Sequence, residues 1–180
     1  MQFSTLFLAV FPVLALAAPA TLPKRQFPAQ PNPNEDITMA AGAWLQDTGF
    51  VSSFLDFAVS TFPNPPPNLF ANAAQALSAE LDEVNHKTIL DNFFVNNTLT
   101  PNQDVVNAYN VLVTQGTFQA VVNGLMNITA TGNLADVATI NANRCANVLP
   151  AIDVYFNAVA VATGQTGFFA AIRPAACGGV

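Results

Sequence analysis

The only histidine of this chain lies in the sequence Glu83-Val84-Asn85-His86, where a carboxylate and an imidazole are three residues apart. On a helix, two side chains at this spacing lie on the same side, one turn apart. A carboxylate oxygen and an imidazole nitrogen so placed are typical ligands of a divalent metal ion inside a helical bundle. Glu83 and His86 are therefore candidate metal ligands.

Two observations favour an ordinary helix surface instead. A two-metal centre of this kind uses a second Glu-x-x-His motif, which a chain with one histidine cannot supply. An apolar seam through Leu77 and Leu81 would also leave His86 facing away from the core. We therefore expect an ion pair between Glu83 and Lys87, His86 on a solvated or partly covered face, and no bound metal or other cofactor.

The serines and carboxylates match no catalytic arrangement. Ser78 lies eight residues before His86, too far along one helix to be its hydrogen-bonded nucleophile. Glu80 and Glu83 are neighbours on one helix, whereas the two carboxylates of a glycosidase flank a cleft. The sequence also has no glycine-rich phosphate loop. We predict no catalytic residue and a protein that is not an enzyme.

The amino-terminal residues have the features of an export leader. Residues 6–16 form a short apolar run, and Ala15-Leu16-Ala17 fits the small-x-small pattern at which signal peptidase cuts. We predict a signal peptide over residues 1–17, a propeptide over residues 18–25 that ends at the processing pair Lys24-Arg25, and a proline-rich extended tail over residues 26–33. The remaining residues, 34–180, have the length of one domain.

Composition limits the partners. Loss of the leader with Lys24 and Arg25 leaves three basic residues against eleven acidic ones, a net charge of −8. Such a chain repels nucleic acid, and no basic stripe offsets the average. No later segment supplies the roughly 18 uninterrupted apolar residues of a spanning helix, so we expect no transmembrane segment in the mature chain.

The two cysteines and two sequons fit an oxidising compartment. Cys145 and Cys177 are an even pair, which predicts one disulfide. Asn96 and Asn127 begin Asn-x-Thr sequons, which predict glycosylated turns at the surface.

Apolar spacing predicts an all-α, single-domain, up-and-down bundle of about five helices. No strand-like alternation bounded by hairpin turns occurs. Thr100 is the expected N-cap of the third helix, with Pro101 in its first turn, and Pro150 should kink or divide the fifth. The first helix should bury Trp44 and Leu55. The expected helices begin at Ile37, Leu69, Pro101, Thr117 and Asn133, and the seam of the second runs through Ala73, Leu77, Leu81 and Val84.

Four segments resemble small secreted proteins of filamentous fungi: "NEDITMAAGAWLQDTGFVSSFLDFA", "ALSAELDEVNHKTILDNFF", "VTQGTFQAVVNGL" and "NRCANVLPAIDVYFNA". The likeness covers most of residues 34–158. A fainter resemblance, through Glu83 and His86 alone, is to secreted fungal proteins with a ferritin-like domain. The resemblance implies an extracellular or cell-wall location and an effector-like role in host interaction, and it implies no reaction.

Three functions follow as hypotheses. The first is a secreted, non-enzymatic protein that binds an extracellular protein or glycan. The second is a carrier of an apolar ligand such as a lipid, suggested by fifteen phenylalanines and a cluster at Phe93, Phe94, Phe168 and Phe169. The third is a degenerate ferritin-like metal-binding protein.

Overall fold

The computed structural model describes residues 36–165 and 169–178. The predicted signal peptide, propeptide and extended tail lie outside the described residues, as does Phe168.

The described residues are helical and contain no strand, which confirms the all-α prediction. Three of the helices run directly into, or are interrupted by, a five-residue π turn, written η. In chain order the elements are α1 (Ile37–Thr61), α2 (Leu69–Asp91), η1 (Asn92–Asn96), α3 (Gln103–Tyr109), η2 (Asn110–Thr114), α4 (Thr117–Thr131), α5 (Asp136–Asn143), η3 (Arg144–Val148), α6 (Leu149–Thr163) and the 3-10 turn η4 (Ala175–Cys177).

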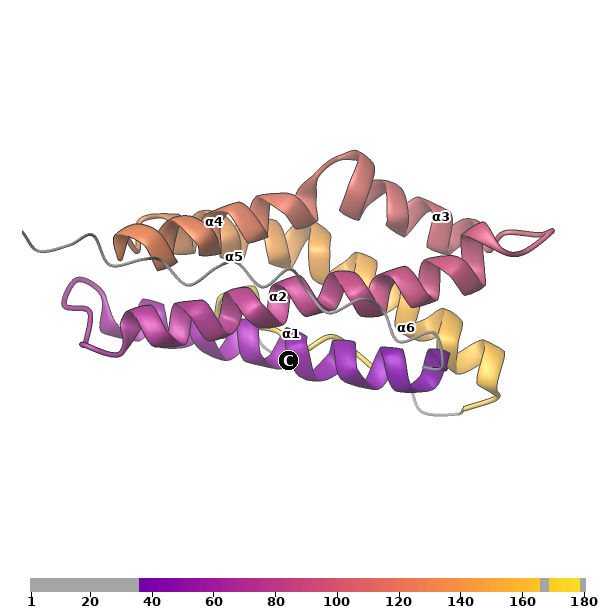
Figure 1. Ribbon diagram of the computed structural model, residues 1–180, viewed down its shortest axis with the longest axis horizontal. Coiled ribbons are helices and arrows are strands. Elements are labelled where there is room, and N and C mark those ends of the chain that lie inside the picture. The colour runs from indigo at the N-terminus through magenta and orange to yellow at the C-terminus, as the bar shows by residue number, and fades with distance from the viewer. Residues whose placement is uncertain (1–35, 166–168, 179–180) are drawn as a thin grey trace, which may run out of the picture.

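These elements make four rods that alternate in direction along the molecule (Figure 1). The rods are α1, α2 with η1, α3 with η2 and α4, and α5 with η3 and α6. The sequence predicted α3 and α4 as separate members of an up-and-down bundle, but they follow one another in the same direction. Gly116, at φ 70°, is the N-cap of α4, and a linker this short bends the rod without reversing it.

The start of α3 differs from the prediction. The N-cap is Asn102, whose side chain accepts hydrogen bonds from the backbone N–H groups of Asp104 and Val105. Thr100 is two residues too early, and its own backbone N–H is bound by Thr98 Oγ1. Asparagine and threonine are both good caps, so residue type alone did not separate them.

Pro150 divides the fifth predicted helix. It lies in the first turn of α6, and the π turn η3 comes directly before it. Proline has no N–H to donate to the carbonyl one turn back, and a π turn widens the helix where that bond is missing. The division places Arg144, the first residue of η3, deep in the bundle.

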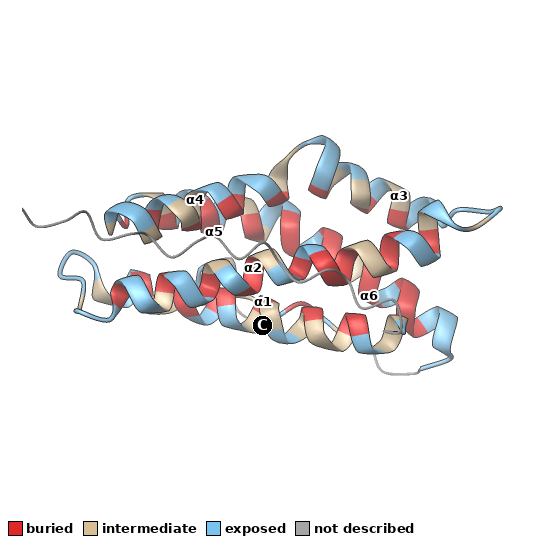
Figure 2. Ribbon diagram, in the orientation of Figure 1, coloured by how far each residue is buried: buried red, intermediate tan, exposed pale blue. Residues whose placement is uncertain are grey.

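The core lies between the rods, where buried positions form an inner stripe on each helix (Figure 2). On α1 this stripe includes Trp44, Val51 and Leu55, as predicted. On α2 the predicted seam is confirmed at Ala73, which is fully buried, but Leu77 and Leu81 are only partly buried and Val84 is 38% exposed. The stripe that α2 buries instead steps by three and four residues through Ala73, Ala76, Glu80, Glu83, Lys87 and Leu90.

One helical stretch of the described residues, Asp136–Thr163, is long and apolar enough to cross a membrane by length and composition alone, with a mean hydropathy of 1.4. Half of its apolar window is buried inside the bundle, as in many core helices. The absence of a membrane span from the mature chain stays a prediction.

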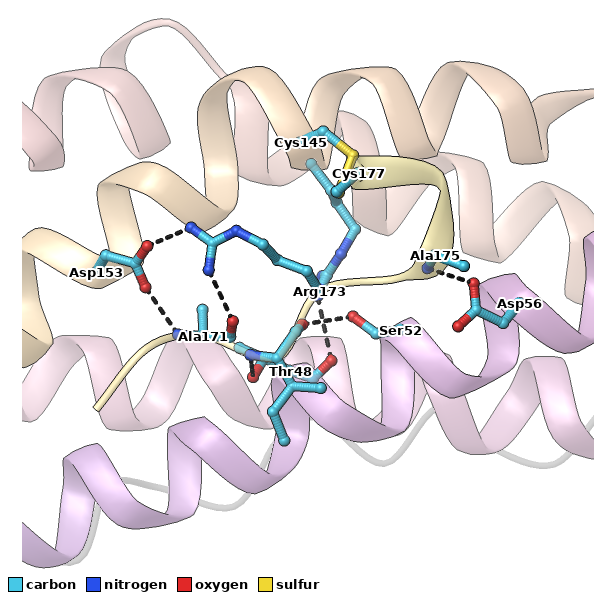
Figure 3. Close-up of a disulfide and its surroundings, with 11 residues drawn as sticks. Thr48, Ser52, Asp56, Cys145, Asp153, Ala171, Arg173, Ala175 and Cys177 are labelled. Carbon is cyan, nitrogen blue, oxygen red and sulfur yellow. Dashed lines mark hydrogen bonds and ion pairs between the residues drawn. A yellow bond between two sulfur atoms is a disulfide. The ribbon is translucent and has the colours of Figure 1, made fainter. Parts of the chain in front are cut away.

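The last described residues, 169–178, form a C-terminal strap across α1 (Figure 3). Ser52 Oγ donates a hydrogen bond to the Ile172 carbonyl at 2.6 Å, and the Ile172 N–H donates to Thr48 Oγ1 at 3.0 Å. The predicted disulfide between Cys145 and Cys177 is present, with the two Cα atoms 5.2 Å apart. The strap therefore joins α1 to η3 through both hydrogen bonds and a covalent bond.

Candidate functional site: the polar face of α2 and the groove between α3 and α6

Glu80, Glu83 and Arg144 form a buried ionic cluster, and each residue is 0% exposed. Arg144 Nη1 donates a hydrogen bond to Glu80 Oε2 at 2.7 Å and lies 3.8 Å from Glu83 Oε1. Trp44 Nε1 donates to Glu83 Oε2 at 2.7 Å. The cluster joins α1, α2 and η3 in the centre of the bundle, since each of the three elements contributes a side chain to it.

The cluster holds two carboxyl groups against one guanidinium, which sets its protonation. Burial raises the pKa of Glu80 to about 7, although the charge and hydrogen bond of Arg144 oppose the shift. Burial and then the charge of Glu80 raise the pKa of Glu83 well above its usual range. Arg144 lies closer to Glu80 than to Glu83, and its charge lowers the pKa of both carboxyl groups against the effect of burial.

A second buried ion pair lies one turn further along α2. Lys87 Nζ and Asp91 Oδ2 are 2.5 Å apart, and Tyr155 OH donates to Asp91 Oδ1 at 2.5 Å. The ammonium also lies 4.3 Å from the centre of the Tyr109 ring, a cation–π distance. The predicted pair of Glu83 with Lys87 is therefore wrong, because both residues turn inward to partners on other helices or further along α2.

His86 is buried rather than solvated, and it faces α1. Its Nε2 atom lies 3.5 Å from Asp47 Oδ2 and 3.6 Å from Asp82 Oδ2. Burial, then the charges of Asp82 and Glu80, raise the pKa of Asp47 to about 7. The three side chains form a polar triad at the edge of the α1–α2 pair.

The Glu-x-x-His motif does not act as one unit. Glu83 is directed to Trp44 and Arg144, whereas His86 lies beside Asp47 and Asp82. Within the described residues, the group that brings His, Asp or Glu ligand atoms within 4.8 Å of one another is Asp47, Asp82 and His86, without Glu83. The Glu-x-x-His spacing in the sequence identified His86, but it could not identify Asp47, which comes from α1.

A groove of about 760 Å³ lies between the α3–η2 segment and the η3–α6 segment. Its floor is made of small apolar side chains and its edges carry four asparagines and two aspartates. Asp153 is already engaged by the N–H of Ala171 and by the guanidinium of Arg173. The lining residues are Asn102, Asp104, Asn107, Ala108, Val111, Ala146, Asn147, Pro150, Ala151, Asp153, Val154, Asn157, Ala158 and Val161.

No protein-family model, curated protein or solved structure matches this chain significantly. The kinship with small secreted fungal proteins stays a prediction.

The first sequon runs from the end of η1 into the loop that follows it, and the second lies within a helix. Asn96 ends η1 and Asn127 lies inside α4, and both are exposed. Asn127 Nδ2 donates to Asp136 Oδ2 at 2.6 Å, so the folded chain holds this amide in place. Use of either sequon stays a prediction.

The predicted phenylalanine cluster is divided between core and surface. Phe93 and Phe94 stack edge to face with ring centres 4.9 Å apart, but Phe94 is buried and Phe93 is half exposed. Phe169 packs partly against the core. Among the described phenylalanines, Phe54, Phe94, Phe118 and Phe156 are buried, whereas Phe50, Phe62, Phe70 and Phe93 are more than half exposed.

Proposed function

We propose that this protein is a secreted, non-enzymatic binding protein, acting outside the cell or at the cell wall, that holds an extended segment of a partner protein in the α3–α6 groove. The groove's lining carries this proposal. The export features of residues 1–25 and the disulfide between Cys145 and Cys177 support the location, because disulfides persist in oxidising compartments.

The side chains that line the groove are suited to binding a peptide. No histidine, serine, cysteine or lysine occurs among the lining residues that the structure describes. Four asparagine amides supply both donors and acceptors, which match the backbone N–H and C=O groups of an extended peptide. The small floor residues, such as Ala108 and Ala151, leave room for apolar side chains of that peptide.

Charge and shape favour a particular partner. No aromatic side chain lines the described groove, so a sugar ring would find no stacking surface. Asp104 is exposed at the edge, and the whole chain carries a net charge of −6. Complementarity then favours a neutral or basic segment.

The test is selection of peptides from a displayed random library against the secreted protein, in parallel with an array of cell-wall oligosaccharides. We expect extended peptides with apolar and basic residues to bind. In NMR spectra of the protein, binding should shift the backbone amide signals of α3 and α6. Asn157→Trp should fill the groove and weaken binding at least about tenfold, a loss of about 1.4 kcal/mol.

The matched control is Gln75→Trp, an equally bulky change at an exposed position of α2 that does not line the groove. It should leave peptide affinity unchanged. If the protein binds an oligosaccharide and Asn157→Trp abolishes that binding, the partner of the groove is a glycan and not a peptide. Turnover of a substrate in a hydrolase and oxidase screen, lost in a groove variant, would contradict a non-enzymatic role.

A second candidate is a carrier of an apolar ligand, and one observation favours it. A hollow of about 610 Å³ near the start of α1 is lined by the apolar side chains of Ile37, Ile89 and Phe93, together with the polar residues Asp36, Asn92, Asn97 and Thr98. If a lipid binds there, native mass spectrometry of the secreted protein should show a co-purified ligand that is reduced in Phe93→Ser. A spectrum without lipid, and no uptake of a fluorescent fatty acid, would remove this candidate.

A further inference from the structure

We propose that Asp47, Asp82 and His86 bind one zinc ion at the edge of the α1–α2 pair. This site is independent of the groove and adds a metal to the proposed binding function. It differs from the Glu-x-x-His pair of the sequence, since Glu83 takes no part and Asp47 comes from another helix.

The separations between the three side chains fit ligands of one ion better than hydrogen bonds. Nε2 of His86 lies 3.5 Å from Asp47 Oδ2 and 3.6 Å from Asp82 Oδ2. A strong hydrogen bond from nitrogen to oxygen is shorter, at about 2.7–3.2 Å. Zinc bonds of about 2.0–2.2 Å place two ligands of a tetrahedral ion about 3.3–3.6 Å apart, which agrees with both separations.

The environment of Asp47 is a second, independent observation. Its Oδ2 atom is buried and accepts no hydrogen bond from the described residues, although it faces His86 Nε2. A buried carboxylate oxygen without a donor is destabilising unless a proton or a cation balances it. The lysine and arginine side chains that the structure describes are paired with other carboxylates: Lys87 with Asp91, Arg144 with Glu80 and Arg173 with Asp153.

The ligand set indicates which ion suits the site. One imidazole nitrogen with two carboxylate oxygens is a usual set for zinc, whereas magnesium and calcium prefer oxygen alone. The Asp82 side chain is 52% exposed, which gives the ion access and leaves its fourth position to water. Bound zinc would also link α1 to α2, since Asp47 belongs to α1 and the other two ligands to α2.

The first experiment is a zinc titration of the full secreted protein, without a histidine tag and stripped of metal. We expect one zinc ion per chain, with no competition from excess magnesium. Because the chain has a single histidine, its imidazole nitrogens give one assignable set of ¹⁵N signals. Zinc should shift the Nε2 signal of that set. Titration with no saturable equivalent, or with the Nε2 signal unmoved, would overturn the proposal.

Variants assign the ligands. His86→Gln and Asp82→Asn should each lower zinc affinity more than about 100-fold, since even residues that only support a ligand account for about 10–100-fold. Asp82 is exposed, so its substitution should leave the fold intact. Asp136→Asn, a matched change on α5, should not alter affinity. Neither should Glu83→Gln; a large loss there would show that the Glu-x-x-His pair binds the metal and would overturn the proposed ligand set.

Discussion

Replacing Arg144 by methionine should lower the free energy of unfolding by about 3–5 kcal/mol, the range typical when one partner of a buried ion pair is removed. Methionine keeps most of the apolar volume but removes the charge that compensates Glu80 and lies beside Glu83. Glu80 would then be buried without its cationic partner and would lose the hydrogen bond from Arg144. Urea unfolding followed by far-ultraviolet circular dichroism measures the loss.

Arg173→Met is the matched control. Arg173 pairs with Asp153 near the surface, where an ion pair typically contributes no more than about 1 kcal/mol. The double variant Arg144→Met with Glu80→Leu should recover at least half of the stability, because it removes the unpaired carboxylate together with its partner. Wild-type stability in Arg144→Met would contradict the central position that we assign to this residue.

Removal of the disulfide by Cys145→Ala with Cys177→Ala should lower the free energy of unfolding by about 3–4 kcal/mol. The bond closes a loop with a sequence separation of 32 residues, and the estimate follows from the entropy that this closure removes from the unfolded chain. The same urea experiment with and without a thiol reductant measures the effect.

Reduced wild-type protein should match the double alanine variant, and the reductant should not change the variant itself. Equal midpoints for oxidised and reduced wild type would mean that the strap holds α1 through its hydrogen bonds alone. Ser52→Ala, which deletes the bond to the Ile172 carbonyl, should cost no more than about 1–2 kcal/mol in either state.

The helices α1 and α2 show how much of the buried core can be predicted from the sequence alone. On α1 the apolar residues repeat on one side, and the structure buries that side, including Trp44 and Leu55. On α2 the same reasoning selected Leu77, Leu81 and Val84, although Glu80 and Lys87 are the buried positions. Hydrophobic periodicity assumes that charged residues lie outside, and it fails where distant partners neutralise them.

Those partners are distant in sequence. Arg144 meets Glu80 across 64 residues, as does Tyr155 with Asp91. No local pattern reveals such pairs. One signal was available, because Ala73, Ala76, Glu80 and Glu83 continue a three-four spacing of small and charged residues on one stripe.

The candidate sites were less predictable than the helices. His86 could be identified from its type, but Asp47 joins it only because α1 packs beside α2. The groove depends on the relative directions of α3 and α6. The prediction had these directions wrong, because it treated α3 and α4 as antiparallel neighbours, whereas they run in the same direction. The disulfide was predictable because two cysteines allow one pairing.

The strap also fixes when folding can be completed. Ser52 cannot form its hydrogen bond until the ribosome has added Ile172, which lies 120 residues later in the chain. At typical synthesis rates of about 5–20 residues per second, that interval lasts about 6–24 s. Until Ile172 has been added, the middle of α1 lacks this cover, and Cys145 can form its disulfide only after Cys177 follows. The middle of the first helix is therefore secured only after 120 further residues have been added to the chain.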